Sequence, residues 1–187
     1  MGKEERVISA AREAMKHSVD HLKEDLRKVR TGRANTALLD GIRIDYYGTP
    51  TPLNRVATLS APDPRLIMVS PFEKSSLQAI EKAIQASDLG LTPSNDGKLI
   101  RLTIPQLTEE RRKELVKVVR RYAEEGRVAV RNVRRDAIHH LKEAEKNGEM
   151  AYDELGRAEE RVQKLTDEHT KLIDDLLKHK EAEILEV

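Results

Sequence analysis

The stretch "TEERRKELVKVVRRYAEEGRVAVRNVRRDAIHHLKEAEKNG", from Thr108 to Gly148, decides the fold. Thr108 is a favourable N-cap, and Asn147-Gly148 is a typical helix stop. Between them no proline interrupts a repeat of apolar residues at spacings of three and four, which predicts one amphipathic helix to about Lys146. A helix of roughly 38 residues is about 57 Å long. It cannot bury its apolar stripe without partner helices.

Two further segments have the same helical period and supply those partners. They lie at residues 3–30 and from about Met150 to near the end of the chain. The first repeat consists of Ile8, Ala11, Met15, Val19, Leu22, Leu26 and Val29, and the second of Leu155, Val162, Leu165, Leu172, Leu176 and Ile184. Three long helices joined in this way predict an antiparallel three-helix bundle.

Between the first two helices the sequence pattern is no longer helical, and all seven prolines of the chain lie in the range from Pro50 to Pro105. The strings "IRIDYY", "RVATLSA", "RLIMVS" and "LIRLTI" predict strands, "GTPTP" and "SNDGK" predict turns, and "SSLQAIEKAIQAS" predicts a short helix. This segment is therefore predicted to form a small α/β unit.

The predicted fold class is α+β with two domains. Residues 1–30 and 106–187 form the three-helix bundle, and residues 31–105 form an α/β domain inserted between helix one and helix two. The chain crosses between them near Arg30–Asn35 and Ile104–Thr108. Two such crossings favour a hinge, for which the candidate residues are Arg33, Ala34, Pro105 and Gln106.

Composition excludes several classes of protein. No apolar run is long enough to cross a bilayer, and the N-terminus has no secretory signal. The absence of cysteine excludes disulfides, thiolate zinc sites and a cysteine nucleophile. We expect a soluble cytoplasmic protein that does not contact membranes.

Candidate catalytic and metal sites are weak. His17 and His21 are spaced i, i+4, but they have no cysteine partner and stand among ordinary surface acids. His169 falls on the seam of the last helix, where a structural role is expected. No phosphate-binding glycine loop or nucleophile elbow is present. The sequence predicts no catalytic residue, no metal site and no cofactor.

The net charge of +1 hides a strong segregation of charge. Residues 111–135 contain ten Lys or Arg against three Glu, a net charge of +7, whereas residues 149–187 contain six against twelve, a net charge of −6. On a helical wheel at about 100° per residue, the second helix separates a core face from a basic arc. The core face holds Leu115, Val118, Val119, Tyr122, Ala129, Val133, Ala137 and Leu141, with Val130 at its border. The basic arc holds Arg112, Lys113, Lys117, Arg120, Arg127, Arg131, Arg134 and Arg135.

Two interpretations of this arc remain open. It is either a solvated face with salt bridges to acidic neighbours or a binding surface for a polyanion. Glu124 and Ile138 intrude on the arc, but its charge is nearly all of one sign. This and the dominance of arginine over lysine favour phosphate recognition. The scarcity of aromatics, 3% of residues, argues against stacking on unpaired bases. A nucleic-acid partner would then be folded RNA, not DNA, held through phosphates and shape.

Several strings in this sequence resemble signatures of the ribosome recycling factor family, across essentially the whole chain and in family order. They are "RTGRAN" (Arg30–Asn35), "YYGTPTPLN" (Tyr46–Asn54), "SDLGLTPSNDGKLIRL" (Ser87–Leu102), "LTEERRKELVK" (Leu107–Lys117), "VRNVRRDA" (Val130–Ala137) and "KLTDEHTKLIDDLLKHKEAEI" (Lys164–Ile184). The chain departs from the family pattern at Gly126, where alanine is more usual.

The resemblance implies a three-helix bundle with an inserted α/β domain, arranged as an L. It also implies a monomeric translation factor that binds the large ribosomal subunit after termination and, with elongation factor G and that partner's GTP hydrolysis, splits the ribosome. The rRNA-contacting arginines of the family correspond to Arg112, Arg131 and Arg134. Further candidates are Arg127 and Arg135 on the same arc, and Arg30 and Arg33 in "RTGRAN".

Two other classes of protein stay open on the residues alone. A coiled-coil scaffold would explain the long helices, but it would not need the inserted unit or the one-sign arc. A metal-dependent hydrolase would require a metal at His17 and His21.

Overall fold

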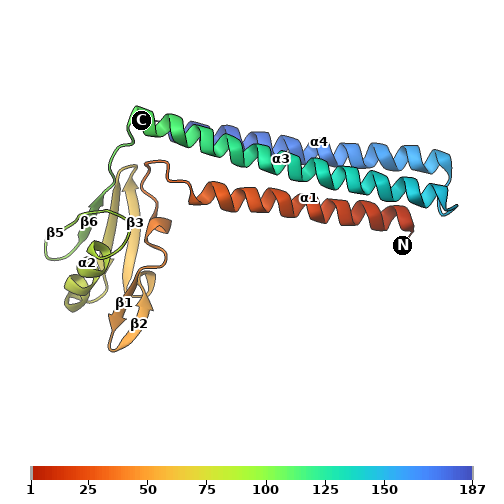
Figure 1. The fold of residues 1–187 in the computed structure, drawn as a ribbon. Coiled ribbons are helices and arrows are strands. Elements are labelled where there is room, and N and C mark those ends of the chain that lie inside the picture. The colour runs from red at the N-terminus through yellow and green to blue at the C-terminus, as the bar shows by residue number, and fades with distance from the viewer. Residues whose placement is uncertain (1, 187) are drawn as a thin grey trace. The chain divides into compact units, whose positions relative to one another are not determined.

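A computed structural model describes residues 2–186, which form two compact units (Figure 1). One unit contains the chain up to Thr31 and from Glu109 onward, and the other contains Gly32–Thr108. The first unit is helical and the second contains the sheets, so the predicted α+β fold is confirmed. The limits of the units lie one to three residues from those predicted at 30/31 and 105/106.

The helical unit consists of α1 (Lys3–Lys28), α3 (Glu109–Lys146) and α4 (Tyr152–Leu185), packed side by side along their lengths (Figure 1). α3 ends where the sequence predicts, because Gly148 takes a φ of +76° and the Glu149 amide donates to the Ala144 carbonyl at 2.8 Å. α4 begins at Tyr152, and the Glu154 carboxylate accepts from the Ala151 amide at 3.1 Å. Three helices of 26, 38 and 34 residues thus bury one another's apolar stripes.

The buried face of α3 differs from the predicted one. Val130, expected at the border, is fully buried, whereas Val133, expected in the core, is half-buried. The buried residues are Leu115, Val119, Ala123, Gly126, Val130, Ala137, Leu141 and Ala144. This face is rotated by about 30° toward the arginines, because it must cover α1 and α4 together and not the most apolar arc of α3 alone.

The seam of α4 also needs correction. Leu172 is 49% exposed, and Ile173 takes the core position beside it. Leu155 and Leu176 are half-buried, while Val162, Leu165 and Ile184 are buried as predicted. Apolar residues on adjacent positions of a helix cannot both face the core, and the periodicity of the sequence did not decide between Leu172 and Ile173.

The second unit is built on an antiparallel four-stranded sheet in the order β3-β4-β6-β5, with α2 (Leu77–Gln85) as its helix. The strands are β3 (Ala57–Asp63), β4 (Leu66–Pro71), β5 (Pro93–Asn95) and β6 (Ile100–Thr103). A separate hairpin joins β1 (Arg43–Tyr46) and β2 (Thr49–Pro52), and short 3₁₀ helices lie at Thr36–Leu39, Leu53–Arg55 and Lys74–Ser76. Its core includes Leu39, Leu53, Ile67, Val69, Ile80, Ile84, Ile100 and Leu102.

The prediction of a turn at "GTPTP" is wrong in part. Only Tyr47 and Gly48 form the turn, and Thr49–Pro52 pairs with Arg43–Tyr46 as strand β2. This hairpin is a sheet of two strands, so β2 has a free edge where prolines without an amide hydrogen are tolerated. The turn at "SNDGK" is likewise shorter, since Ser94 and Asn95 belong to β5.

Candidate nucleic-acid interface

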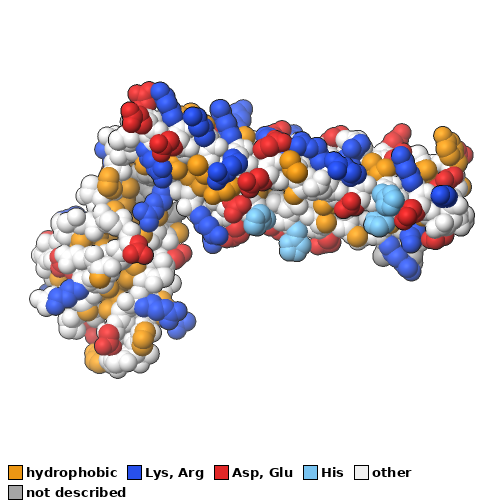
Figure 2. Space-filling view, in the orientation of Figure 1, with side chains coloured by type: hydrophobic (Ala, Val, Ile, Leu, Met, Phe, Trp, Pro, Cys, Tyr) orange, Lys and Arg blue, Asp and Glu red, His pale blue; other side chains and the backbone are white. Residues whose placement is uncertain are grey.

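The basic arc of α3 lies along the flank of its buried face. Arg112, Arg127 and Arg134 are half-buried, whereas Arg120, Arg131 and Arg135 are exposed. Figure 2 shows Lys and Arg side chains gathered along the bundle with Asp and Glu side chains among them. The partners of each arginine therefore decide which of them can reach a ligand.

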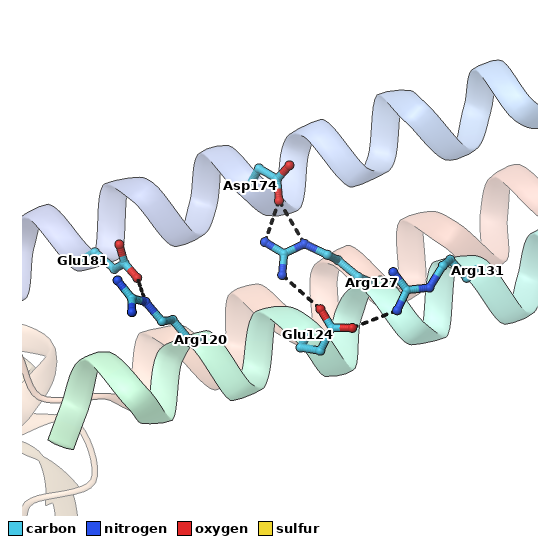
Figure 3. Close-up of polar contacts among 6 residues, drawn as sticks. All are labelled: Arg120, Glu124, Arg127, Arg131, Asp174 and Glu181. Atoms are coloured by element: carbon cyan, nitrogen blue, oxygen red, sulfur yellow. Dashed lines mark hydrogen bonds and ion pairs between the residues drawn. The ribbon is translucent and has the colours of Figure 1, made fainter. Parts of the chain in front are cut away.

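Arg127 is bound to carboxylates on two helices (Figure 3). Its Nε and Nη2 donate to Asp174 Oδ1 at 2.9 and 2.6 Å, and its Nη1 donates to Glu124 Oε2 at 3.2 Å. The hydrogen bonds that Arg127 donates to Asp174, and then the one that it donates to Glu124, raise the pKa of Arg127. Its guanidinium is thus occupied in joining α3 to α4.

Glu124 and Glu181 hold two further arginines of the arc (Figure 3). Arg131 Nη2 donates to Glu124 Oε1 at 2.8 Å, and Arg120 Nε donates to Glu181 Oε1 at 2.6 Å. The guanidinium groups of Arg131 and Arg127 lower the pKa of Glu124. These are the salt bridges that the solvated-face interpretation predicts. Arg131 is still about half-exposed, so its pairing leaves other nitrogens accessible.

Arg134 has a different environment from Arg127. Its Nε donates to Gln163 Oε1 at 2.7 Å, while Gln163 Nε2 donates to Asp167 Oδ1 at 2.9 Å. Within residues 2–186, the two terminal nitrogens of Arg134 have no hydrogen-bond or ion-pair partner. The neutral amide of Gln163 therefore holds Arg134 through Nε and leaves the two terminal nitrogens of the guanidinium available for an anion.

Arg112 and Arg135 complete the set of arginines whose donors are available. The Arg112 Nε is buried without a hydrogen-bond partner among the described residues. Arg135 is exposed, and no described side chain pairs with it. Because this nitrogen is buried, a ligand would reach Arg112 through its terminal nitrogens, which have no partner among the described residues.

The candidates near the crossings lie outside this arc. Arg30 is exposed just beyond the end of α1, and Arg33 is exposed at the start of the second unit. The Ala34 amide donates to the Pro64 carbonyl at 2.6 Å, which ties this hinge candidate to the α/β unit. Pro105 and Gln106 are exposed and belong to no helix or strand.

The two crossings touch one another inside the second unit. A Cβ atom placed on Gly32, whose φ is +78°, would lie 2.9 Å from Leu107 Cγ. Only glycine takes this backbone conformation without strain, and only glycine leaves room for Leu107 here. The glycine in "RTGRAN" is thereby explained by close approach.

The sequence did not point to Gln163 as a partner of Arg134. Gln163 lies on α4, and Arg134 lies 29 positions earlier in the chain. The only sequence signal for such partners was the acidic excess of the last helix. It indicated that carboxylate partners lie on that helix, but it did not single out Asp174 or Glu181.

Two of the histidines contact groups four residues away on their own helices. His21 Nε2 lies 3.4 Å from Asp25 Oδ2, and His169 Nδ1 lies 2.7 Å from the Leu165 carbonyl oxygen. Within residues 2–186, no cluster of three or more His, Asp or Glu side chains is placed to hold a metal ion. In the same residues, no helix has the length and apolarity needed to span a membrane.

The chain is similar in sequence and in fold to known proteins. A family model described as ribosome recycling factor matches residues 22–185. Proteins named ribosome-recycling factor from Geobacillus kaustophilus and Alkaliphilus metalliredigens are 53% and 57% identical, over 97% and 94% of this chain and 98% and 95% of their own lengths.

Two solved structures are also similar over 100% of both chains. One is a solution structure of the ribosome recycling factor, with 40% identity and a TM-score of 0.77. The other, with 49% identity and a TM-score of 0.66, is described as models for the T. thermophilus ribosome recycling factor and the E. coli elongation factor G bound to the E. coli post-termination complex. These similarities span both units of the chain.

Proposed function

The chain belongs to the ribosome recycling factor family, and from this premise we propose that it binds the large ribosomal subunit after termination and splits the ribosome into subunits together with elongation factor G. The similar structure bound with elongation factor G to a post-termination complex supports this partnership. GTP hydrolysis by the partner supplies the energy, so this chain acts mechanically and not as an enzyme. It acts as a monomer in the cytoplasm.

The anchor on rRNA is the part of the basic arc that keeps free donors. Arg134 carries this proposal, because Gln163 holds its Nε at 2.7 Å while both terminal nitrogens stay available for phosphate oxygens. Arg112, Arg131 and Arg135 add donors along the same arc. Arg127 contributes by joining α3 to α4, since its three nitrogens are taken by Asp174 and Glu124.

The proposal predicts that Arg134→Ala weakens binding to the large ribosomal subunit by about tenfold, as expected for loss of one charge-assisted phosphate contact. The slope of log affinity against log salt concentration should fall by about 1, because one fewer counterion is released. Both quantities are measured by co-sedimentation with large subunits across a salt series.

Arg121→Ala is the matched control on the same helix. Arg121 is exposed, lies against Tyr122 and Glu125 and is not part of the arc, so its removal should leave the salt slope unchanged. Equal loss of affinity in both variants would mean that general charge, not the arc, holds the subunit. Unchanged affinity in Arg134→Ala would remove this residue from the anchor.

A further inference from the structure

An exposed tyrosine stands at the tip of the β1–β2 hairpin. Tyr47 is 82% exposed, and its φ of +51° lies in the left-handed region that tyrosine rarely adopts. The chain contains only four tyrosines and one phenylalanine, so an exposed ring in a strained turn is conspicuous. A large aromatic side chain held out in solvent is the kind of residue that contributes most to protein interfaces.

The hydroxyl groups of two adjacent tyrosines meet on one carboxylate. Tyr46 Oη donates to Glu73 Oε1 at 2.8 Å, and Tyr47 Oη donates to Glu73 Oε2 at 3.2 Å. The two rings are edge to face, with centroids 4.6 Å apart. The hydrogen bond and charge of Glu73 raise the pKa of both tyrosines. The rings and the carboxylate are therefore held in one fixed arrangement.

This arrangement lines an open cavity of about 160 Å³ in the α/β unit. The polar residues around it are Asp45, Tyr46, Tyr47, Glu73, Ser75 and Ser76. Two of the lining residues are carboxylates, and none of them is Lys or Arg. The cavity is thus suited to a cation and would repel phosphate.

We propose that this cavity binds the guanidinium group of an arginine presented by a partner protein. A planar guanidinium stacks on a tyrosine ring, here Tyr47, and its parallel N–H groups match a carboxylate. Each oxygen of Glu73 accepts one tyrosine hydroxyl and keeps a second acceptor site, so bidentate pairing remains available. The cavity lies in the second unit and uses none of the arginines proposed to hold rRNA, so the two sites fail or succeed separately.

The test uses the full-length ¹⁵N-labelled protein and the capped tripeptide acetyl-Gly-Arg-Gly-amide, followed by NMR. Saturable shifts are expected at the amides of Tyr47, Glu73 and Ser75, with affinity on the order of millimolar for a single side chain. The matched probe carries citrulline, which has the same shape without the charge, and should bind at least about fivefold more weakly.

Variants locate the effect. Glu73→Gln and Tyr47→Ala should each weaken the arginine peptide at least about fivefold, while Tyr152→Ala, at another exposed tyrosine, should leave it unchanged. If Glu73→Gln does not fold, Asp45→Asn tests the same charge from an exposed strand position.

Three outcomes would overturn the proposal. The first is equal binding of the citrulline and arginine peptides, and the second is unchanged binding by the Glu73 and Tyr47 variants. The third is a response at Tyr47 to the oligonucleotide hexauridylate but not to the arginine peptide, which would assign base stacking in place of guanidinium binding.

Discussion

Arg127 and Arg134 lie two turns apart on α3, and their neighbours give them different roles. Arg127 is only 23% exposed in its side chain and contacts two carboxylates, one of them on α4. Arg134 meets a neutral amide through one nitrogen. The same residue type on the same face therefore stabilises the bundle at one position and offers donors to a ligand at the other.

Arg127→Ala should lower the free energy of unfolding of the bundle by about 1 kcal/mol, because the charge-assisted hydrogen bonds between α3 and α4 are lost while the half-exposed Asp174 becomes hydrated. Arg135→Ala should change it by less than about 0.5 kcal/mol, since the side chain is exposed without a described partner. Urea unfolding followed by circular dichroism measures both. Equal effects would contradict the structural role of Arg127.

The carboxylate between Arg127 and Arg131 predicts a dependence of stability on pH. The folded protein lowers the pKa of Glu124 below its usual value of 4.5, so folding favours the ionised form. The stability that wild type holds over Glu124→Gln should be fully present above about pH 4.5 and should vanish as the pH falls through the lowered pKa. Urea unfolding at a series of pH values from 7 to 3 measures this difference. A difference that persists at the acid end would show that charge is not its source.

At the scale of the element, α3 has clear capping residues at its ends but contains one residue, Gly126, that is unfavourable in a helix. Gly126 is buried in the middle of the helix, where glycine costs about 0.5–1 kcal/mol relative to alanine. A Cβ atom there would lie 3.4 Å from Ile173 Cδ1 and 3.5 Å from Leu22 Cδ2, which is ordinary contact. The helix has room for a methyl group and no more at this place.

Gly126→Ala should therefore raise the free energy of unfolding by about 0.5–1 kcal/mol, and Gly126→Leu should lower it because Ile173 and Leu22 already fill the space. Gly156→Ala in α4 is the matched control, since that glycine is helical with no neighbour within 4 Å and reports helix propensity alone. Thermal and urea unfolding compare the three. Destabilisation by Gly126→Ala, with stabilisation by Gly156→Ala, would show that the helices cannot accept the methyl group.

Element boundaries were largely predictable, and helix faces less so. Thr108, Asn147 and Gly148 marked α3 to within a residue, because capping depends on local chemistry. The choice between Val130 and Val133, or between Leu172 and Ile173, depended on the neighbouring helices. The strand at Thr49–Pro52 escaped prediction because its prolines are tolerated only on an edge that the sequence does not reveal.

At the scale of the whole molecule, the chain divides into two units, each with its own core, and passes between them twice. Linking segments without helix or strand, such as Pro105-Gln106, favour motion between units. We propose that the units swing about Arg33, Ala34, Pro105 and Gln106 when elongation factor G acts. The Ala34 amide donates to the Pro64 carbonyl, so at this hinge Ala34 marks the side of the α/β unit.

A disulfide engineered to join the two units should leave binding to the large subunit unchanged and abolish splitting, because the anchor is intact while the swing is blocked. Reduction of the same variant should restore splitting and serves as its control. Co-sedimentation measures binding, and light scattering measures the separation of subunits. A locked protein that still splits ribosomes would show that the swing is unnecessary.

Membership of the family, the α+β fold and the two-unit organisation followed from the sequence, because periodicity, caps and signature strings are properties of neighbouring residues. The different roles of the individual arginines did not follow from the sequence. Arg127 and Arg134 both belong to the basic arc in the sequence, and only the packing of α4 places Asp174 against one and Gln163 against the other. Partners 47 and 29 positions away cannot be assigned from local pattern, since their register is set by how two long helices pack.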